Sequence, residues 1–132
     1  MHMLDTNIII KAIRQKDHPV RTKLANSSYG SLCISSITYT ELLYGVYRSA
    51  CPEKNLSSLH ALLSWIDILP FSLSAAECSG RVMAYLASAG KPIGDRDMLI
   101  ASHALSLGIP LVTHNVQEFS RVPRLAIEDW LE

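Results

Sequence analysis

The chain has few cysteines, and their spacing excludes the usual roles of cysteine in a small domain. Cys33, Cys51 and Cys78 are far apart and form neither a Cys-x-x-Cys pair nor a cluster with histidine. Structural zinc sites need such clusters, and disulfide-stabilised secreted domains need a dense, even set of cysteines. We therefore expect a cytoplasmic protein in which all three thiols are reduced and packed as small hydrophobic side chains.

The sequence also lacks a charge excess and a long hydrophobic run. Twelve basic residues balance twelve acidic ones, so the overall charge does not attract polyanions, and any contact with nucleic acid must be local. The apolar runs are far shorter than the roughly 20 residues of a membrane span. No basic segment followed by an apolar one stands at the N-terminus, so we expect neither secretion nor membrane insertion.

No linker, repeat or low-complexity block divides the sequence, which predicts a single domain over residues 1–132. Short apolar runs alternate with stretches of helical periodicity, as in an α/β fold with a mostly parallel sheet of four to five short strands flanked by helices. The expected strands are 2–4, 32–34, 66–69, 110–113 and 125–127. The expected helices are 6–15, 18–27, 37–48, 53–64, 74–90 and 95–107. Thr6 is expected to cap the first helix, a capping box at 74–77 opens the fifth, and Gly108 stops the last.

Four acidic residues interrupt apolar runs: Asp5, Glu41, Asp97 and Glu118. A carboxylate beside buried residues costs several kcal/mol unless it is paired, hydrogen-bonded or bound to a cation. Mg²⁺ and Mn²⁺ prefer carboxylate oxygens, so one shared metal site would explain all four. The expected strands and helices support this hypothesis, because they bring all four residues to the carboxyl edge of the sheet, where parallel sheets bind ligands.

Each acidic residue also has a structural alternative. Asp5 could cap the first helix, and Glu41 could close a capping box with Thr38. Asp97 and its neighbour Asp95 could both favour the positive end of a helix dipole. Helical geometry places Asp97 on the apolar side of its helix and Asp95 at the exposed start, so we expect Asp97 to be the ligand.

Glu118 is expected in a loop or short turn beside Phe119. Two residues past its strand, Asn115 could supply a neutral oxygen or orient a water. His114 is a candidate for substrate contact, whereas His103 is expected to pack inside the domain.

The four acidic residues lie in segments that resemble one family in their order and spacing. These are Met3-Leu-Asp-Thr-Asn7 and the segments at 35–45, 90–104 and 112–119. Together they resemble the PIN-domain ribonucleases, and more narrowly the VapC-type toxins of bacterial toxin–antitoxin pairs, over essentially the whole chain.

The resemblance implies roles for individual residues. Asp5, Glu41 and Asp97 would hold Mg²⁺ or Mn²⁺, and Glu118 would be the fourth acidic residue. Thr6, Asn7 and Thr113 would orient carboxylates or water. Asn115 stands where many PIN domains carry aspartate, which leaves open whether one or two metals bind.

The resemblance also implies an activity and partners. It predicts a metal-dependent endoribonuclease that blocks translation by cleaving structured RNA, with tRNA, and in particular the anticodon loop of initiator tRNA, as the leading candidate. A VapB-type antitoxin, a homodimer and a toxin–antitoxin hetero-oligomer would be its assemblies. The alternatives are a metal-dependent DNA nuclease or phosphatase using the same pocket, and a non-catalytic binding module with the PIN fold.

Two further features bear on these partners. Five basic residues near the acidic segments are candidates for RNA contact: Lys11, Arg14, Lys16, Lys91 and Arg96. The helix expected at 37–48 is apolar almost all the way round, more than one buried face requires. Ordinary burial would explain this, and so would antitoxin docking.

Overall fold

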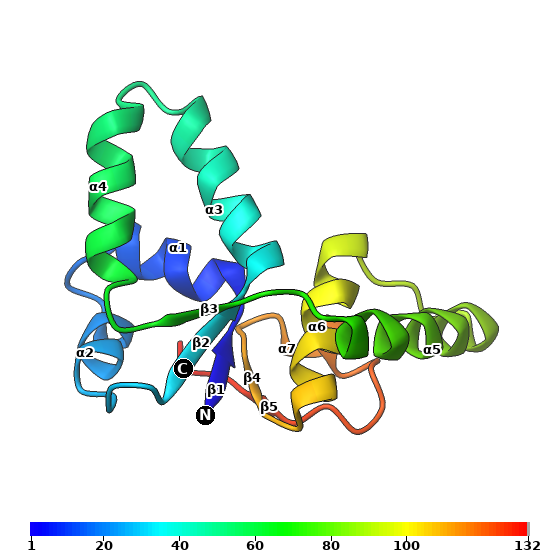
Figure 1. Ribbon diagram of the computed structural model, residues 1–132. Coiled ribbons are helices and arrows are strands. Elements are labelled where there is room, and N and C mark those ends of the chain that lie inside the picture. The colour runs from blue at the N-terminus through cyan, green and yellow to red at the C-terminus, as the bar shows by residue number, and fades with distance from the viewer. Residues whose placement is uncertain (132) are drawn as a thin grey trace.

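The computed structural model describes residues 1–131, which fold around one five-stranded sheet (Figure 1). The strands are β1 (His2–Leu4), β2 (Leu32–Ser35), β3 (Asp67–Leu69), β4 (Leu111–Val112) and β5 (Ile127–Glu128). They lie in the order β3-β2-β1-β4-β5, and each neighbouring pair is parallel. The predicted parallel α/β fold is confirmed, and the carboxyl ends of all these strands meet at one edge.

The helices cover both faces of this sheet (Figure 1). They are α1 (Thr6–Arg14), α2 (Pro19–Ala25), α3 (Ser36–Arg48), α4 (Pro52–Leu62), α5 (Leu73–Ala89), α6 (Asp95–Leu107) and α7 (Val116–Phe119). Successive residues of a strand point to opposite faces, so Leu4 joins the core beneath α1, α2 and α4, and Met3 joins the core beneath α5 and α6. The six expected helices are present with small shifts at their ends, and α7 lies where a loop or short turn was expected.

Two expected helix caps are wrong and one structural alternative fails, and hydrogen bonding explains each. Asp5, not Thr6, caps α1, because its Oδ1 accepts from the Thr6 amide. Ser72, not Ser74, caps α5, because its hydroxyl accepts from the Ala75 amide. The capping-box alternative for Glu41 fails as well, since α3 is capped by Ser35 and residue 38 already lies inside the helix.

Strand β5 starts later than expected, at Ile127 rather than residue 125. Arg124 has a φ of 67°, so the chain is still in a turn one residue before the expected start of this strand. Cys33 and Cys78 are buried as expected, but Cys51 is exposed because it caps α4 in the turn after α3. Within residues 1–131 no helix combines the length and apolar character needed to cross a membrane.

His103 on α6 is buried, as expected for a packing residue. Its Nδ1 lies 2.9 Å from the Ser35 hydroxyl, and its ring packs against that of Phe71 in a T-shaped arrangement. Burial lowers the pKa of His103, so the ring is neutral near pH 7 and ties α6 to the end of β2.

The strand order creates a switch point between β1 and β4. From β1 the chain runs outward through β2 and β3, then crosses to the other side of β1 to form β4 and β5. Open parallel sheets bind ligands at the carboxyl edge where the direction reverses in this way. Asp5 directly follows β1 and Thr113 directly follows β4, so both stand at this point.

Candidate active site

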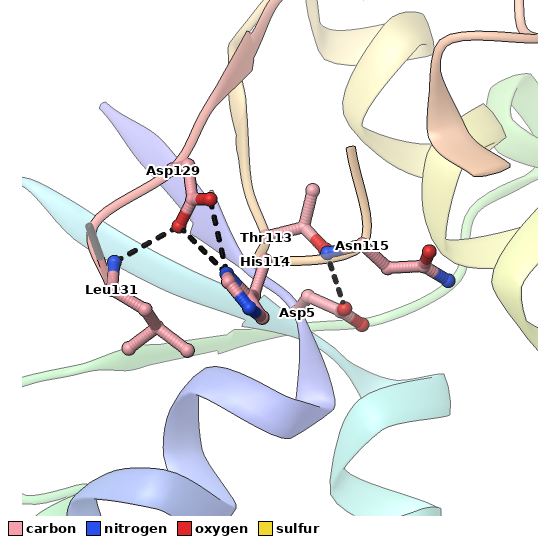
Figure 2. Close-up of polar contacts among 6 residues, drawn as sticks. All are labelled: Asp5, Thr113, His114, Asn115, Asp129 and Leu131. Carbon is pink, nitrogen blue, oxygen red and sulfur yellow. Dashed lines mark hydrogen bonds and ion pairs between the residues drawn. The ribbon is translucent and has the colours of Figure 1, made fainter. Parts of the chain in front are cut away.

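Asp5 is held at the switch point by two hydrogen bonds. Its Oδ1 accepts from the Thr6 amide at 2.8 Å. Its Oδ2 accepts from the Thr113 hydroxyl at 2.9 Å, and Figure 2 shows this second bond. Thr113 is itself oriented, because its hydroxyl oxygen accepts from the Asn115 amide. Only 2% of Asp5 is exposed. Burial raises its pKa despite these bonds, and the charges of Glu41 and Glu118 add to the rise.

Glu41 reaches the same point from α3. Its Oε1 accepts from the Thr6 hydroxyl at 2.7 Å, so the residue after Asp5 orients a second carboxylate. Its Oε2 forms an ion pair with Nε of Arg96 at 3.1 Å. Both oxygens of Glu41 therefore have partners within the protein.

Asp97 lies in the first turn of α6 and is half-buried. Burial raises its pKa to about 6, helped by the negative charges of Asp5, Glu118 and Glu41. Its neighbour Asp95 is exposed, as expected. Repulsion among these carboxylates favours the protonated form of Asp97.

Glu118 is positioned by α7 and by the loop before α6. Its Oε1 accepts from the Gly94 amide at 2.9 Å, and its Oε2 accepts from the Asn115 side-chain amide at 2.6 Å. These bonds, the Gly94 bond first, lower the pKa of Glu118. Glu118 therefore stays ionised when Asp97 takes up a proton.

Asp5, Glu41 and Asp97 meet at one cavity of about 460 Å³, here called the acidic pocket. Its lining is Asp5, Thr6, Asn7, Ile10, Thr40, Glu41, Tyr44, Gly45, Arg96 and Asp97. Asn7 is exposed on α1. Glu118 stands beside the pocket through its bond to Gly94, and Thr113 and Asn115 lie behind Asp5 and Glu118.

The donor set fits a hard divalent cation. Carboxylate oxygens dominate it, and their mutual repulsion is what a bound cation would relieve. Gly94 keeps space open, since a Cβ there would lie 3.6 Å from Oδ2 of Asp97 and 3.8 Å from Oε1 of Glu118. As placed, no three acidic, histidine or cysteine side chains of residues 1–131 already enclose a metal-sized space. Ligation would therefore draw the carboxylates inward.

We expect Gly94→Ala to weaken metal binding without unfolding the protein. Gly94 has φ −58° and ψ 146°, a conformation that alanine adopts freely, and the added methyl makes only ordinary contacts. The methyl would nevertheless lie against the carboxyl groups of both Asp97 and Glu118 and restrict their movement toward a cation. Mn²⁺ affinity measured by calorimetry should fall roughly tenfold, as for other changes next to metal ligands.

The matched control is Gly80→Ala on α5, where nothing lies within 4 Å of an added Cβ. It should leave Mn²⁺ affinity unchanged. Equal Mn²⁺ affinities for Gly94→Ala and the wild-type protein would show that the space beside Gly94 is not part of the metal site.

Two side-chain pairs at this edge were missed by sequence reasoning. One is the pairing of Arg96 with Glu41, since the sequence indicates only an RNA contact for Arg96. The other joins His114 to Asp129, with Nδ1 3.0 Å from Oδ2, while Asp129 also accepts from the Leu131 amide (Figure 2). His114 does not line the acidic pocket. No local sequence signal connects these partners, since β5 brings Asp129 beside His114 only in the folded sheet.

Comparison with known proteins agrees with this geometry. The PIN domain family model matches residues 2–125. The chain is 45% identical to the tRNA(fMet)-specific endonuclease VapC of Shigella flexneri over 128 residues, covering 97% of this chain and 96% of that protein. It is 40% identical to ribonuclease VapC2 of Haemophilus influenzae over 130 residues, or 98% of each chain.

A solved structure shows the same fold. The crystal structure of DNA-bound VapBC from Salmonella typhimurium contains a chain that is 42% identical, with a TM-score of 0.93, covering 98% of this chain and 97% of that one. Identity at this level over nearly the full length establishes common family membership. The chain therefore belongs to the PIN-domain family and, within it, to the VapC ribonucleases.

Proposed function

We propose that residues 1–132 form a single PIN domain that cleaves RNA endonucleolytically with Mg²⁺ or Mn²⁺. Asp5, Glu41 and Asp97 would hold the cation, and Glu118 would be the fourth acidic residue of the site. The observation that carries this proposal is the convergence of these carboxylates at the switch point between β1 and β4, with the pKa values of Asp5 and Asp97 raised. Such perturbed acids in a cleft are typical of functional sites.

The residues around the proposed cation have different roles in catalysis. A divalent cation in such a site stabilises the charge that develops on a phosphate and lowers the pKa of a bound water. Thr6 and Thr113 fix the orientation of Asp5, and Thr6 also fixes Glu41. Glu118, kept ionised by Gly94 and Asn115, can accept a hydrogen bond from the attacking water and so orient it.

We propose tRNA as the substrate class, with the anticodon loop of initiator tRNA as the cleaved segment. The support is the 45% identity to a relative named for tRNA(fMet). A pocket at a sheet edge also favours an unstacked loop, because a single phosphate must reach the carboxylates. Because tRNA is found in the cytoplasm, we propose that the enzyme acts there.

A VapB-type antitoxin is the proposed partner, by analogy with the solved VapBC complex. A groove of about 290 Å³ lies between α1, α3 and α4, and it shares Ile10, Glu41 and Gly45 with the acidic pocket. Its apolar lining includes Ile10, Ile13, Leu42 and Val46. An apolar antitoxin segment in this groove would reach the acidic pocket, and the toxin would also form homodimers and hetero-oligomers.

The central experiment compares the purified protein with its Asp5→Asn variant on total RNA with Mg²⁺ or Mn²⁺. We expect cleavage that requires the cation and is lost in the variant, with the new 5′ ends mapping to tRNA anticodon loops. Equal cleavage by both proteins would exclude the proposed site. Cleavage of DNA rather than RNA would favour the alternative nuclease.

Metal affinity should fall in acid. The pKa of Asp97 is raised to about 6, so between pH 7 and pH 5 its carboxylate becomes protonated and no longer offers a charged ligand. Below pH 6 the Kd for Mn²⁺ should therefore rise by up to about tenfold per pH unit for each proton displaced. Calorimetric titrations at pH 7.5, 6 and 5 would measure this change.

The exposed Asp95 supplies the control for this titration. Asp95→Asn removes a carboxylate from the same helical turn without touching the pocket, so it should keep the wild-type pH profile. A Kd for Mn²⁺ that stays flat from about pH 5 to pH 8 would contradict carboxylate ligation.

A further inference from the structure

Arg96 places a positive charge inside the acidic pocket. Among the described residues that line this pocket, Arg96 is the one cation. It lies in the first turn of α6, beside Asp97, and its side chain is 68% exposed, whereas that of Glu41 is 22% exposed. A solvent-facing guanidinium therefore neutralises a carboxylate that is held in the pocket wall.

The contact occupies the atom that a metal ligand would need. Oε1 of Glu41 accepts from the Thr6 hydroxyl, and Oε2 is paired with Nε of Arg96 at 3.1 Å. A cation bound at Oε2 would place a second positive charge next to the guanidinium. Two cations at one oxygen repel each other, so binding of the metal and formation of the ion pair oppose one another.

The same contact leaves much of the Arg96 side chain accessible. The contact given by the structure joins Nε to Oε2 of Glu41, and 68% of the Arg96 side chain remains exposed to solvent. Arginine presents its nitrogens in a planar fork that matches phosphate oxygens. Once released from Glu41, Arg96 would stand at the mouth of the pocket with its full donor set available.

We propose that Arg96 exchanges partners during the reaction cycle, pairing with Glu41 in the metal-free pocket and with an RNA phosphate once a divalent cation binds Glu41. This inference rests on the proposed function and adds a positioning residue to it. Arg96 would weaken metal binding in the free enzyme and strengthen binding of RNA. A surface ion pair with a purely structural role would affect neither metal binding nor RNA binding.

The test uses the Arg96→Gln variant and measures metal binding and RNA binding separately. Mn²⁺ binding without RNA, followed by electron paramagnetic resonance, should become roughly two- to fivefold tighter, as expected for loss of an exposed ion pair. With total RNA as substrate, KM should rise about tenfold while kcat changes little, since a charge-assisted contact to phosphate is lost. Arg96→Lys should recover part of the KM effect, because it keeps the charge without the fork.

Arg81→Ala, which removes an exposed arginine from α5 outside the pocket, should change neither quantity. Unchanged or weaker Mn²⁺ binding by Arg96→Gln would overturn the exchange, and so would tighter Mn²⁺ binding with an unchanged KM. If the wild-type protein binds no Mn²⁺, the proposed metal site itself fails and the exchange fails with it. If the wild-type protein binds Mn²⁺ and cleaves RNA, failure of the Arg96 test leaves the proposed function standing.

Discussion

Asp5→Asn is expected to lower kcat for RNA cleavage by about 10²- to 10⁴-fold, because loss of a charged metal ligand removes several kcal/mol of transition-state stabilisation. The fold should be kept. Asparagine retains an oxygen that can accept from the Thr6 amide, and the Thr113 hydroxyl can rotate to accept from the new amide. Removing a buried charge whose pKa is raised should leave the metal-free variant as stable as the wild-type protein or more stable.

Thermal unfolding with and without Mn²⁺ would check this prediction alongside the activity assay. The wild-type Tm should rise with Mn²⁺ because the cation binds the folded state, whereas the Tm of Asp5→Asn should barely move. Asp5→Ala should be as inactive as Asp5→Asn. Its free energy of unfolding should be about 1 kcal/mol lower than that of Asp5→Asn, because alanine cannot cap α1. A metal-dependent rise in Tm for Asp5→Asn that matches wild type would refute the role of Asp5 as a ligand.

Phe119→Ala is expected to lower the free energy of unfolding by about 3–5 kcal/mol. Phe119 is fully buried, at 0% exposure, in the core that also contains Met3, Cys33 and Leu111. Truncation leaves a cavity that this packed core cannot fill. Urea denaturation should show the loss as a lower midpoint with an unchanged slope.

The same substitution should also reduce activity in the molecules that stay folded. Phe119 anchors the short helix α7, which carries Glu118. Val116→Ala, in the same helix but at a position 39% exposed, should change stability by no more than about 0.5 kcal/mol. If Phe119→Ala lowered the free energy of unfolding by as little as Val116→Ala, Phe119 would not be the residue that holds α7 in place.

Much of this fold could be predicted from local patterns. Buried parallel strands give short apolar runs, and helices such as α6 are bounded by local signals, here the stop at Gly108 with its φ of 68°. Caps were harder to assign, because several polar residues compete within one turn. Ser72 and Ser74 are equally suitable by type, and only the backbone conformation decides between them.

The candidate site could be predicted in part for a similar reason. Acidic residues that interrupt apolar runs are visible in the sequence, and the ends of parallel strands must meet at one edge. Partners far apart in the chain were not visible. Arg96 and Glu41 are separated by α4, β3 and α5, and His114 reaches Asp129 only after β5 joins the sheet.

The amino-acid sequence was enough to infer the α/β class, the family and the four acidic residues that meet at one edge of the sheet. These follow from periodicity, motif spacing and the cost of leaving a carboxylate beside a core. The folded structure was needed to show how two of the carboxylates are held: Asp5 by Thr6 and Thr113, and Glu118 by Gly94 and Asn115. It alone paired Arg96 with Glu41, because hydrogen bonds and ion pairs depend on distances of about 3 Å that folding sets and sequence spacing does not.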